Sequence, residues 1–141
     1  MRTLLLIIPL LTLLSCCDHD PVNYSDDYIY LNDTTLFAYQ QTRINTSEGF
    51  TITFDSVITD SRCPLNVECV WEGNAAVEFS YAGNNMDTTF VLNTYGDKLF
   101  PDTVIVGNLL FNLLLVEPYP EFPNQTSIED YRCSLIVKKV N

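Results

Sequence analysis

The sequence predicts an all-β protein, an antiparallel β-sandwich or a partly open barrel of about seven or eight strands. Hydrophobic residues alternate with polar residues along several segments, which is the period of a half-buried strand. Turn-forming residues separate these segments at short intervals. No segment shows the hydrophobic period of a convincing helix.

The first strands follow from this alternation. A short strand is expected near residues 28–31. Residues 50–57, FTITFDSV, place apolar side chains on one face and mostly polar ones on the other. Residues 76–81 and 86–93 alternate in the same way, and Gly83-Asn84-Asn85 between them predicts a β-hairpin.

The C-terminal strands form a second group. Residues 103–106 and 109–117 flank Gly107-Asn108, which predicts another hairpin. Because residues 109–116 are nearly all apolar, we expect this strand to be central and buried. The last strand is expected in residues 130–140, with one face formed by Tyr131, Cys133, Leu135 and Val137.

Residues 1–15 predict a lipoprotein signal peptide. Arg2 precedes an apolar run about half as long as the roughly 20 residues that span a membrane. The run ends in Leu13-Leu14-Ser15-Cys16, which resembles the lipobox of bacterial lipoproteins. That resemblance implies cleavage before Cys16 and a lipid on its sulfur. Lipidation of Cys17 and an ordinary secretory signal are the alternatives.

The mature chain is expected to have a lipidated acidic tether, residues 16–32, and a single β-domain, residues 33–141. Removing Arg2 with the signal lowers the formal net charge from −11 to −12. Such acidity excludes a nucleic-acid binder, which needs a basic surface. Asp18-His19-Asp20 could hold a metal weakly, but a lone histidine in an acidic segment is usually no site, so we expect neither metal nor cofactor.

Residues 60–73, DSRCPLNVECVWEG, contain the most specific pattern. In an exported chain Cys63 and Cys69 are expected to form a disulfide that stabilises by about 2 kcal/mol. Their spacing is wider than the C-x-x-C of redox sites, and the histidines of a typical zinc site are missing nearby. Cys133 is expected to be a buried free thiol, although its pairing with Cys63 or Cys69 stays open.

Three other residues of this segment are candidates for a recognition turn. Arg62 lies between Asp60 and Glu72, so a local ion pair is the simpler interpretation. The alternative is an exposed turn in which Asp60, Arg62 and Trp71 recognise a partner. Because Trp71 has the same strand parity as Cys69, it is expected to pack in the core over the disulfide, with an exposed binding aromatic as the alternative.

Residues 60–79, DSRCPLNVECVWEGNAAVEF, resemble small uncharacterised lipoproteins of Gram-negative envelopes that share the motif D-S-R-C-P-x(4)-C-x-W-x-G. The resemblance implies a lipoprotein with a β-fold. It brings no functional residues with it. We therefore expect a location in the bacterial cell envelope at the outer membrane, with the side it faces left open.

The proline-rich segment 117–124, EPYPEFPN, holds two aromatic residues, Tyr119 and Phe122. Proline favours extended backbone and fixes such residues at low entropic cost. The first expectation is a stiff crossover whose rings close the end of the sandwich. The alternative is an exposed ridge that binds a protein or glycan.

The sequence predicts no enzyme. It lacks the common nucleophile, metalloprotease and nucleotide-binding motifs, and its single histidine lies in the tether. We expect a non-catalytic, lipid-anchored envelope module that binds a protein or glycan partner. The alternatives are a structural subunit of an envelope complex and a hydrolase that uses a pair of carboxylates.

Overall fold

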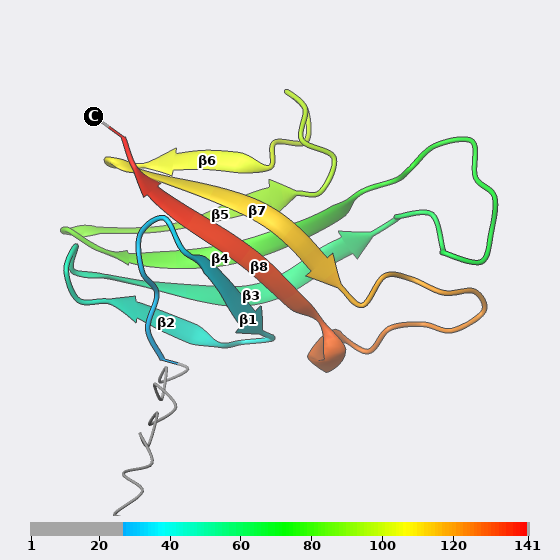
Figure 1. Ribbon diagram of the computed structural model, residues 1–141, viewed down its shortest axis with the longest axis horizontal. Coiled ribbons are helices and arrows are strands. Elements are labelled where there is room, and N and C mark those ends of the chain that lie inside the picture. Colours follow the sequence, from blue (N-terminus) through cyan, green and yellow to red (C-terminus); the bar gives the residue numbers. More distant parts are fainter. Residues whose placement is uncertain (1–26, 141) are drawn as a thin grey trace, which may run out of the picture.

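Two antiparallel four-stranded sheets face each other in the computed structural model, which describes residues 27–140 (Figure 1). One sheet has the order β1-β8-β7-β6 and the other the order β2-β3-β4-β5. The predicted all-β sandwich is confirmed, and the sheets do not close into a barrel. The strands are β1 (Thr34–Ala38), β2 (Thr42–Asn45), β3 (Phe50–Asp60), β4 (Ala75–Gly83), β5 (Met86–Asn93), β6 (Thr103–Val106), β7 (Leu109–Glu117) and β8 (Arg132–Lys139).

Both predicted hairpins are present. β4 and β5 pair through a turn in which Asn84 and Asn85 have φ values of 53° and 59°. Two consecutive left-handed residues are what the tight turn of a twisted hairpin requires, and asparagine tolerates this conformation. β6 and β7 pair through a turn that begins with Gly107, whose φ is 60°.

The described part of the predicted tether lies against the sandwich. Tyr28 forms an isolated bridge with Ile44 and Leu31 forms one with Val137, so residues 28–31 make no regular strand. The side chain of Ile29 between them is 1% exposed and belongs to the core. The packed domain therefore begins before residue 33.

An aromatic cluster fills the space between the sheets. The rings of Phe50 and Phe111, from opposite sheets, meet edge to face with centroids 6.0 Å apart. Phe37 and Phe79 make a similar contact at 6.2 Å. Such pairs add about 0.5–1.5 kcal/mol beyond the burial of their surface. The core also contains the buried thiol of Cys133, as predicted.

The prediction for β7 was half right. The strand is central in its sheet, between β8 and β6, but Leu114 and Leu115 on its outer face are exposed. Its register with β8 shifts between Leu113 and Leu115, where a bulge interrupts the alternation. The apolar run therefore does not mean that both faces are buried, because one face of each sheet in a two-layer sandwich meets solvent.

The two ends of the sandwich differ. At one end the strands are joined by short turns at residues 46–49, 84–85 and 107–108. At the other end lie the long connections 61–74, 94–102 and 118–131, and the first and last of them project beyond the sheets (Figure 1). We call these three connections the loop end. The described chain starts near the short turns, where the carbonyl of Asp27 accepts a hydrogen bond from Ile44.

Candidate functional site

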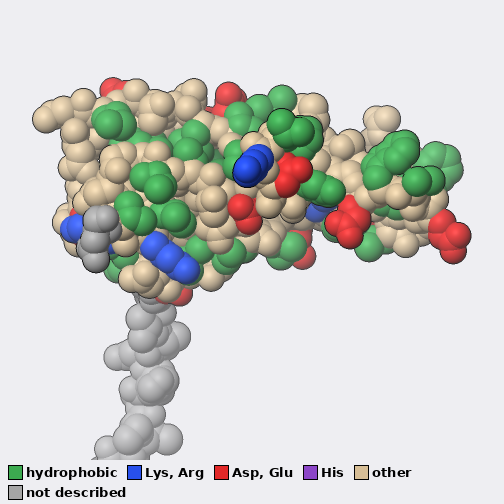
Figure 2. Space-filling view, turned by 90° about the horizontal axis from the view of Figure 1, so that it is seen from above, with side chains coloured by type: hydrophobic (Ala, Val, Ile, Leu, Met, Phe, Trp, Pro, Cys, Tyr) green, Lys and Arg blue, Asp and Glu red, His purple; other side chains and the backbone are tan. Residues whose placement is uncertain are grey.

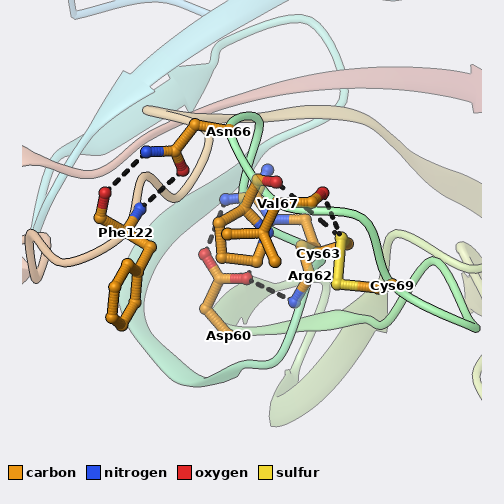
Figure 3. The surroundings of a disulfide bond; sticks show 8 residues. Asp60, Arg62, Cys63, Asn66, Val67, Cys69 and Phe122 are labelled. Carbon is orange, nitrogen blue, oxygen red and sulfur yellow. Dashed lines mark hydrogen bonds and ion pairs between the residues drawn. A yellow bond between two sulfur atoms is a disulfide. The ribbon is translucent and has the colours of Figure 1, made fainter.

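A buried arginine holds the loop end together. Arg62 is 6% exposed and donates from Nε and Nη2 to the two carboxylate oxygens of Asp60, at 2.9 and 2.6 Å (Figure 3). Its Nη1 donates to the carbonyl of Val116 at 2.6 Å, and Nη2 also donates to that of Pro118 at 2.9 Å. These bonds join the β3–β4 loop to the end of β7 in the opposite sheet.

Two tyrosines complete this network. The Tyr119 ring lies under the guanidinium of Arg62, with 4.6 Å between the Arg62 Cζ and the ring centroid. The Tyr131 hydroxyl donates to Asp60 Oδ2 at 3.0 Å. Every charged atom of the ion pair is thus matched, which is the condition under which a buried pair is tolerated.

The environment of the pair sets two pKa values. Burial alone would raise the pKa of the Asp60 carboxyl, but the hydrogen bonds and charge of Arg62, helped by Tyr131, lower it below 3.8. Burial and the neighbouring Asp60 carboxylate raise the pKa of Tyr131 above 10.0. Both shifts keep Asp60 ionised and Tyr131 protonated near neutral pH.

The β3–β4 loop is a stapled hairpin. The backbone amides of Ser61 and Cys63 donate to the carbonyls of Asn74 and Glu72 at 2.8 Å each. Cys63 and Cys69 form the predicted disulfide, with Cα atoms 5.9 Å apart. At the base, Gly73 has φ +74°, and a Cβ there would lie 1.9 Å from the Ser61 carbonyl oxygen. Only glycine fits this position without a shift of the backbone.

The proline-rich loop lies along this hairpin. The Asn66 side chain donates to the Phe122 carbonyl at 2.6 Å and accepts from the Phe122 amide at 2.9 Å (Figure 3). The Leu65 amide donates to the Pro120 carbonyl at 3.0 Å. The two loops are therefore joined by backbone and amide bonds, while the Phe122 ring points away from the disulfide (Figure 3).

Asn74 ties the third loop, residues 94–102, to the β3–β4 hairpin. Asn74 Oδ1 accepts from the backbone amides of Thr94 and Tyr95 at 3.0 and 3.2 Å, and its Nδ2 donates to Asn93 Oδ1 at 2.7 Å. Within that loop, Asp97 Oδ1 accepts from the amides of Leu99 and Phe100, at 2.8 and 2.7 Å. All three long loops thus have a defined place relative to one another.

A cleft of about 400 Å³ lies between the β3–β4 and β5–β6 loops. Its apolar lining consists of Trp71, Tyr95 and Phe100, which are 72%, 53% and 46% exposed. Its polar lining consists of Ser61, Asn74 and Asp97, with Gly73 at the base of the hairpin. We call this the aromatic cleft. Open, aromatic-lined concavities with a few polar groups are typical of binding sites.

Comparison of the chain with protein families, with curated proteins and with solved structures finds no match. The function is therefore inferred from the surface chemistry of the loop end.

Charge on the loop end has one dominant sign. Acidic side chains occur on each long loop, at Glu68, Glu72, Asp97, Asp102, Glu121, Glu129 and Asp130. Within the three loops the basic residues are Lys98 and the buried Arg62, whose charge Asp60 matches. Figure 2 shows hydrophobic and acidic side chains gathered on the projecting end of the molecule.

The three residues of the predicted recognition turn do not form one exposed surface. Asp60 and Arg62 are withdrawn from the surface and form the predicted local ion pair with each other, not with Glu72. The expectation that Trp71 packs in the core was wrong. Residues 70–74, which follow Cys69, form no strand. Two residues that are two positions apart therefore need not point to the same side, and the Trp71 ring does not point into the core.

The expectation that the proline-rich loop closes the sandwich was also wrong. Tyr119 is 38% exposed and Phe122 is 66% exposed, because the loop projects along the β3–β4 hairpin and does not fold over the core. Tyr119 packs on Arg62, whereas the Phe122 ring is free in solvent on the opposite side from the disulfide.

Tyr95, Asp97 and Phe100 were not predicted as site residues. They belong to TYGDKLF, which follows the β5 strand and has no alternating pattern. The sequence feature that could have indicated them is a pair of aromatic residues in a segment rich in turn-forming residues, directly after a predicted strand.

Several predictions concern residues outside the described range. Cys16, Cys17 and Asp18-His19-Asp20 all precede residue 27. Between residues 27 and 140, no group of three or more histidine, cysteine or acidic side chains is arranged to hold a metal ion. In the same range no helix is long and apolar enough to cross a membrane.

Proposed function

We propose that this protein is a non-catalytic, lipid-anchored module of the bacterial cell envelope that binds a partner through its loop end. The observation that carries the proposal is Trp71, a large aromatic side chain held 72% exposed on a rigid hairpin. Tryptophan is enriched at the energetic centres of protein interfaces. Leaving it exposed costs solvation free energy that a binding partner recovers.

The residues around Trp71 serve to hold the hairpin. Arg62 and Asp60 tie its base to the opposite sheet, the Cys63–Cys69 disulfide closes its tip, and Gly73 permits the strands to approach. Trp71 makes no comparable contact and faces the aromatic cleft. A rigid scaffold that presents an exposed ring binds with a low entropic cost, because little has to be ordered on association.

The position of the chain's entry supports the same arrangement. The described chain begins at Asp27 near the short turns, whereas the 61–74 and 118–131 loops project from the other end (Figure 1). A lipid at Cys16 would lie 27 − 16 = 11 positions before this entry. We infer that the loop end faces away from the anchoring membrane, where it can reach a partner.

Assembly into a larger complex is the second candidate. On the outer face of the β1-β8-β7-β6 sheet, Leu36 and Leu115 both pair with Ser134 and are exposed, as are Leu114 and Ile105. This apolar row could pack on another subunit. A carboxylate-dependent hydrolase has less support, because the aromatic cleft has one carboxylate side chain, Asp97, where such a mechanism uses two.

Site-specific photocrosslinking in cells separates these candidates. A photoreactive amino acid would replace Val70, which is 95% exposed beside Trp71, or Leu115 on the outer sheet face, or Asp87 near the short turns. The proposal predicts a discrete adduct from position 70 and none from position 87. An adduct from position 115 alone would favour the assembly subunit, and no adduct at position 70 would overturn partner binding at the loop end.

The anchor needs its own experiment. The Cys16→Ser variant should lose signal processing at that position and leave the outer-membrane fraction, because the lipid supplies the membrane affinity. Cys17→Ser is the matched control and should fractionate like the wild type. Retention of the Cys16→Ser protein in the membrane with unchanged processing would contradict lipidation of Cys16.

A further inference from the structure

We infer that the aromatic cleft binds a cationic side chain, a lysine or arginine on an exposed basic segment of a partner protein. The inference rests on the proposed function, since it names the chemistry of the partner that the loop end takes. It follows from the arrangement of the rings, from the polar groups that remain free, and from the charge around the cleft.

The rings supply a surface suited to a cation. Trp71 comes from the β3–β4 hairpin, and Tyr95 and Phe100 come from the β5–β6 loop, so the cleft has aromatic side chains from both loops. The face of an aromatic ring carries partial negative charge and attracts ammonium and guanidinium groups, tryptophan most strongly. The chain uses this contact internally, where the guanidinium of Arg62 lies over the Tyr119 ring.

The polar groups of the cleft leave a carboxylate oxygen available. Ser61 Oγ is bonded to the backbone of Asn74, donating to its carbonyl at 3.0 Å and accepting from its amide at 3.2 Å. The Asn74 side chain is engaged by Asn93, Thr94 and Tyr95. Asp97 uses Oδ1 for two backbone amides, and no described residue donates to its Oδ2.

This inventory favours a cation over a neutral glycan. A glycan is recognised by amide and hydroxyl groups that donate and accept hydrogen bonds, and those of Ser61 and Asn74 are already engaged. An ionised carboxylate accepts hydrogen bonds and attracts positive charge. The Tyr95 hydroxyl and the Trp71 indole N–H also line the cleft, but Asp97 is the only charged group in its described lining, and it fits a charged donor best.

The charges around the aromatic cleft are also mainly negative. Glu72 lines the adjoining cavity, which shares Gly73 and Tyr95 with the aromatic cleft. The facing cations are Lys98, next to Asp97 in the chain, and Arg62, whose charge is matched by Asp60. Clefts lined by one sign of charge raise the local concentration of the opposite charge.

The test uses the full chain in nonionic detergent and a fluorescein-labelled peptide, Gly-Arg-Gly-Arg-Gly. A peptide with citrulline in place of arginine is the matched probe, because citrulline keeps the shape and removes the charge. We expect fluorescence anisotropy to show binding of the arginine peptide and at least about fivefold weaker binding of the citrulline peptide. Trp71 is the only tryptophan, so a change in its emission places the peptide at the cleft.

Two charge variants complete the design. Asp97→Asn removes the charge but keeps an oxygen that can accept from Leu99 and Phe100, so the loop is preserved. We expect it to weaken binding of the arginine peptide about fivefold or more. Asp87→Asn makes the same change near the short turns and should leave the affinity unchanged.

Three results would overturn the inference. They are equal binding of the two peptides, unchanged affinity in Asp97→Asn, and a response of Trp71 emission to a neutral hexasaccharide but not to the arginine peptide. If position 70 crosslinks in cells while the arginine peptide does not bind, the inference fails and the proposed function stands. If both fail, the loop end is no binding site.

Discussion

Arg62 Nη1 lies 2.6 Å from the carbonyl oxygen of Val116, a residue 54 positions later in the opposite sheet. This bond belongs to a network that also includes Asp60, Tyr119 and Tyr131. It fixes the base of the β3–β4 hairpin relative to the proline-rich loop. The rigidity of the loop end, and so the presentation of Trp71, depends on this buried ion pair.

Replacing Arg62 with alanine should reduce the free energy of unfolding by about 3–5 kcal/mol, because it leaves the Asp60 carboxylate buried without its partner. Urea denaturation measures this change. The control is Lys139→Ala, which breaks the exposed ion pair with Glu48 and should cost no more than about 1 kcal/mol. Similar losses in the two variants would show that the Arg62 network is no stronger than a surface pair.

The ion pair also predicts a pH dependence. The pKa of Asp60 is lowered in the folded protein, so its contribution to stability is complete above the unfolded pKa. That contribution is lost as pH falls through the lower folded pKa, so the free energy of unfolding should decline below about pH 4. In Asp60→Asn the decline should be smaller, whereas Asp87→Asn should follow the wild type. Parallel curves for all three proteins would exclude Asp60 as a source.

The disulfide should contribute modestly to stability. Opening the short loop between Cys63 and Cys69 by the Cys63→Ser, Cys69→Ser double replacement should cost about 2 kcal/mol by the loop-entropy model. Peptide mapping without reduction should recover the Cys63–Cys69 link. Cys133 should react with iodoacetamide only after denaturation, because burial raises its pKa and blocks access. A mapped peptide linked through Cys133 would contradict the pairing.

The two aromatics of the proline-rich loop should behave differently. Tyr119→Ala removes the ring under Arg62 and should destabilise the domain by about 1–2 kcal/mol. Phe122→Ala removes an exposed ring and should change the free energy of unfolding by less than about 0.5 kcal/mol. Thermal and urea unfolding of the single variants measures both. A larger loss from Phe122→Ala than from Tyr119→Ala would show that the loop packs differently.

The sequence was sufficient for the fold class because strand alternation is a local property. The alternation in residues 50–57 and the Asn84-Asn85 turn each indicate the local structure from only a few neighbouring residues. The disulfide was predictable for the same reason, since Cys63 and Cys69 close a short loop. β1 and β2 were not predicted, because they are only five and four residues long and no Gly-Asn or Asn-Asn turn marks them, whereas Gly107-Asn108 marks the equally short β6.

The site was predicted less well because it is assembled from distant segments. Two acids lie near Arg62 in the sequence, but its carbonyl partners Val116 and Pro118 lie 54 and 56 positions away. Trp71 was assigned to the core by its strand parity with Cys69, but no strand runs between Asp60 and Ala75. Tyr95 and Phe100 line the same cleft as Trp71, and Asn74 helps to tie their loop to the β3–β4 hairpin.

The central claim is that a rigid loop end presents Trp71 to a partner. The most direct measurement is crosslinking from position 70 in cells, in the wild-type background and in Trp71→Ala, with the free energy of unfolding measured for both. The account predicts loss of the adduct in Trp71→Ala and a change in unfolding free energy below about 0.5 kcal/mol. An adduct of unchanged yield, or a destabilisation of several kcal/mol, would contradict it.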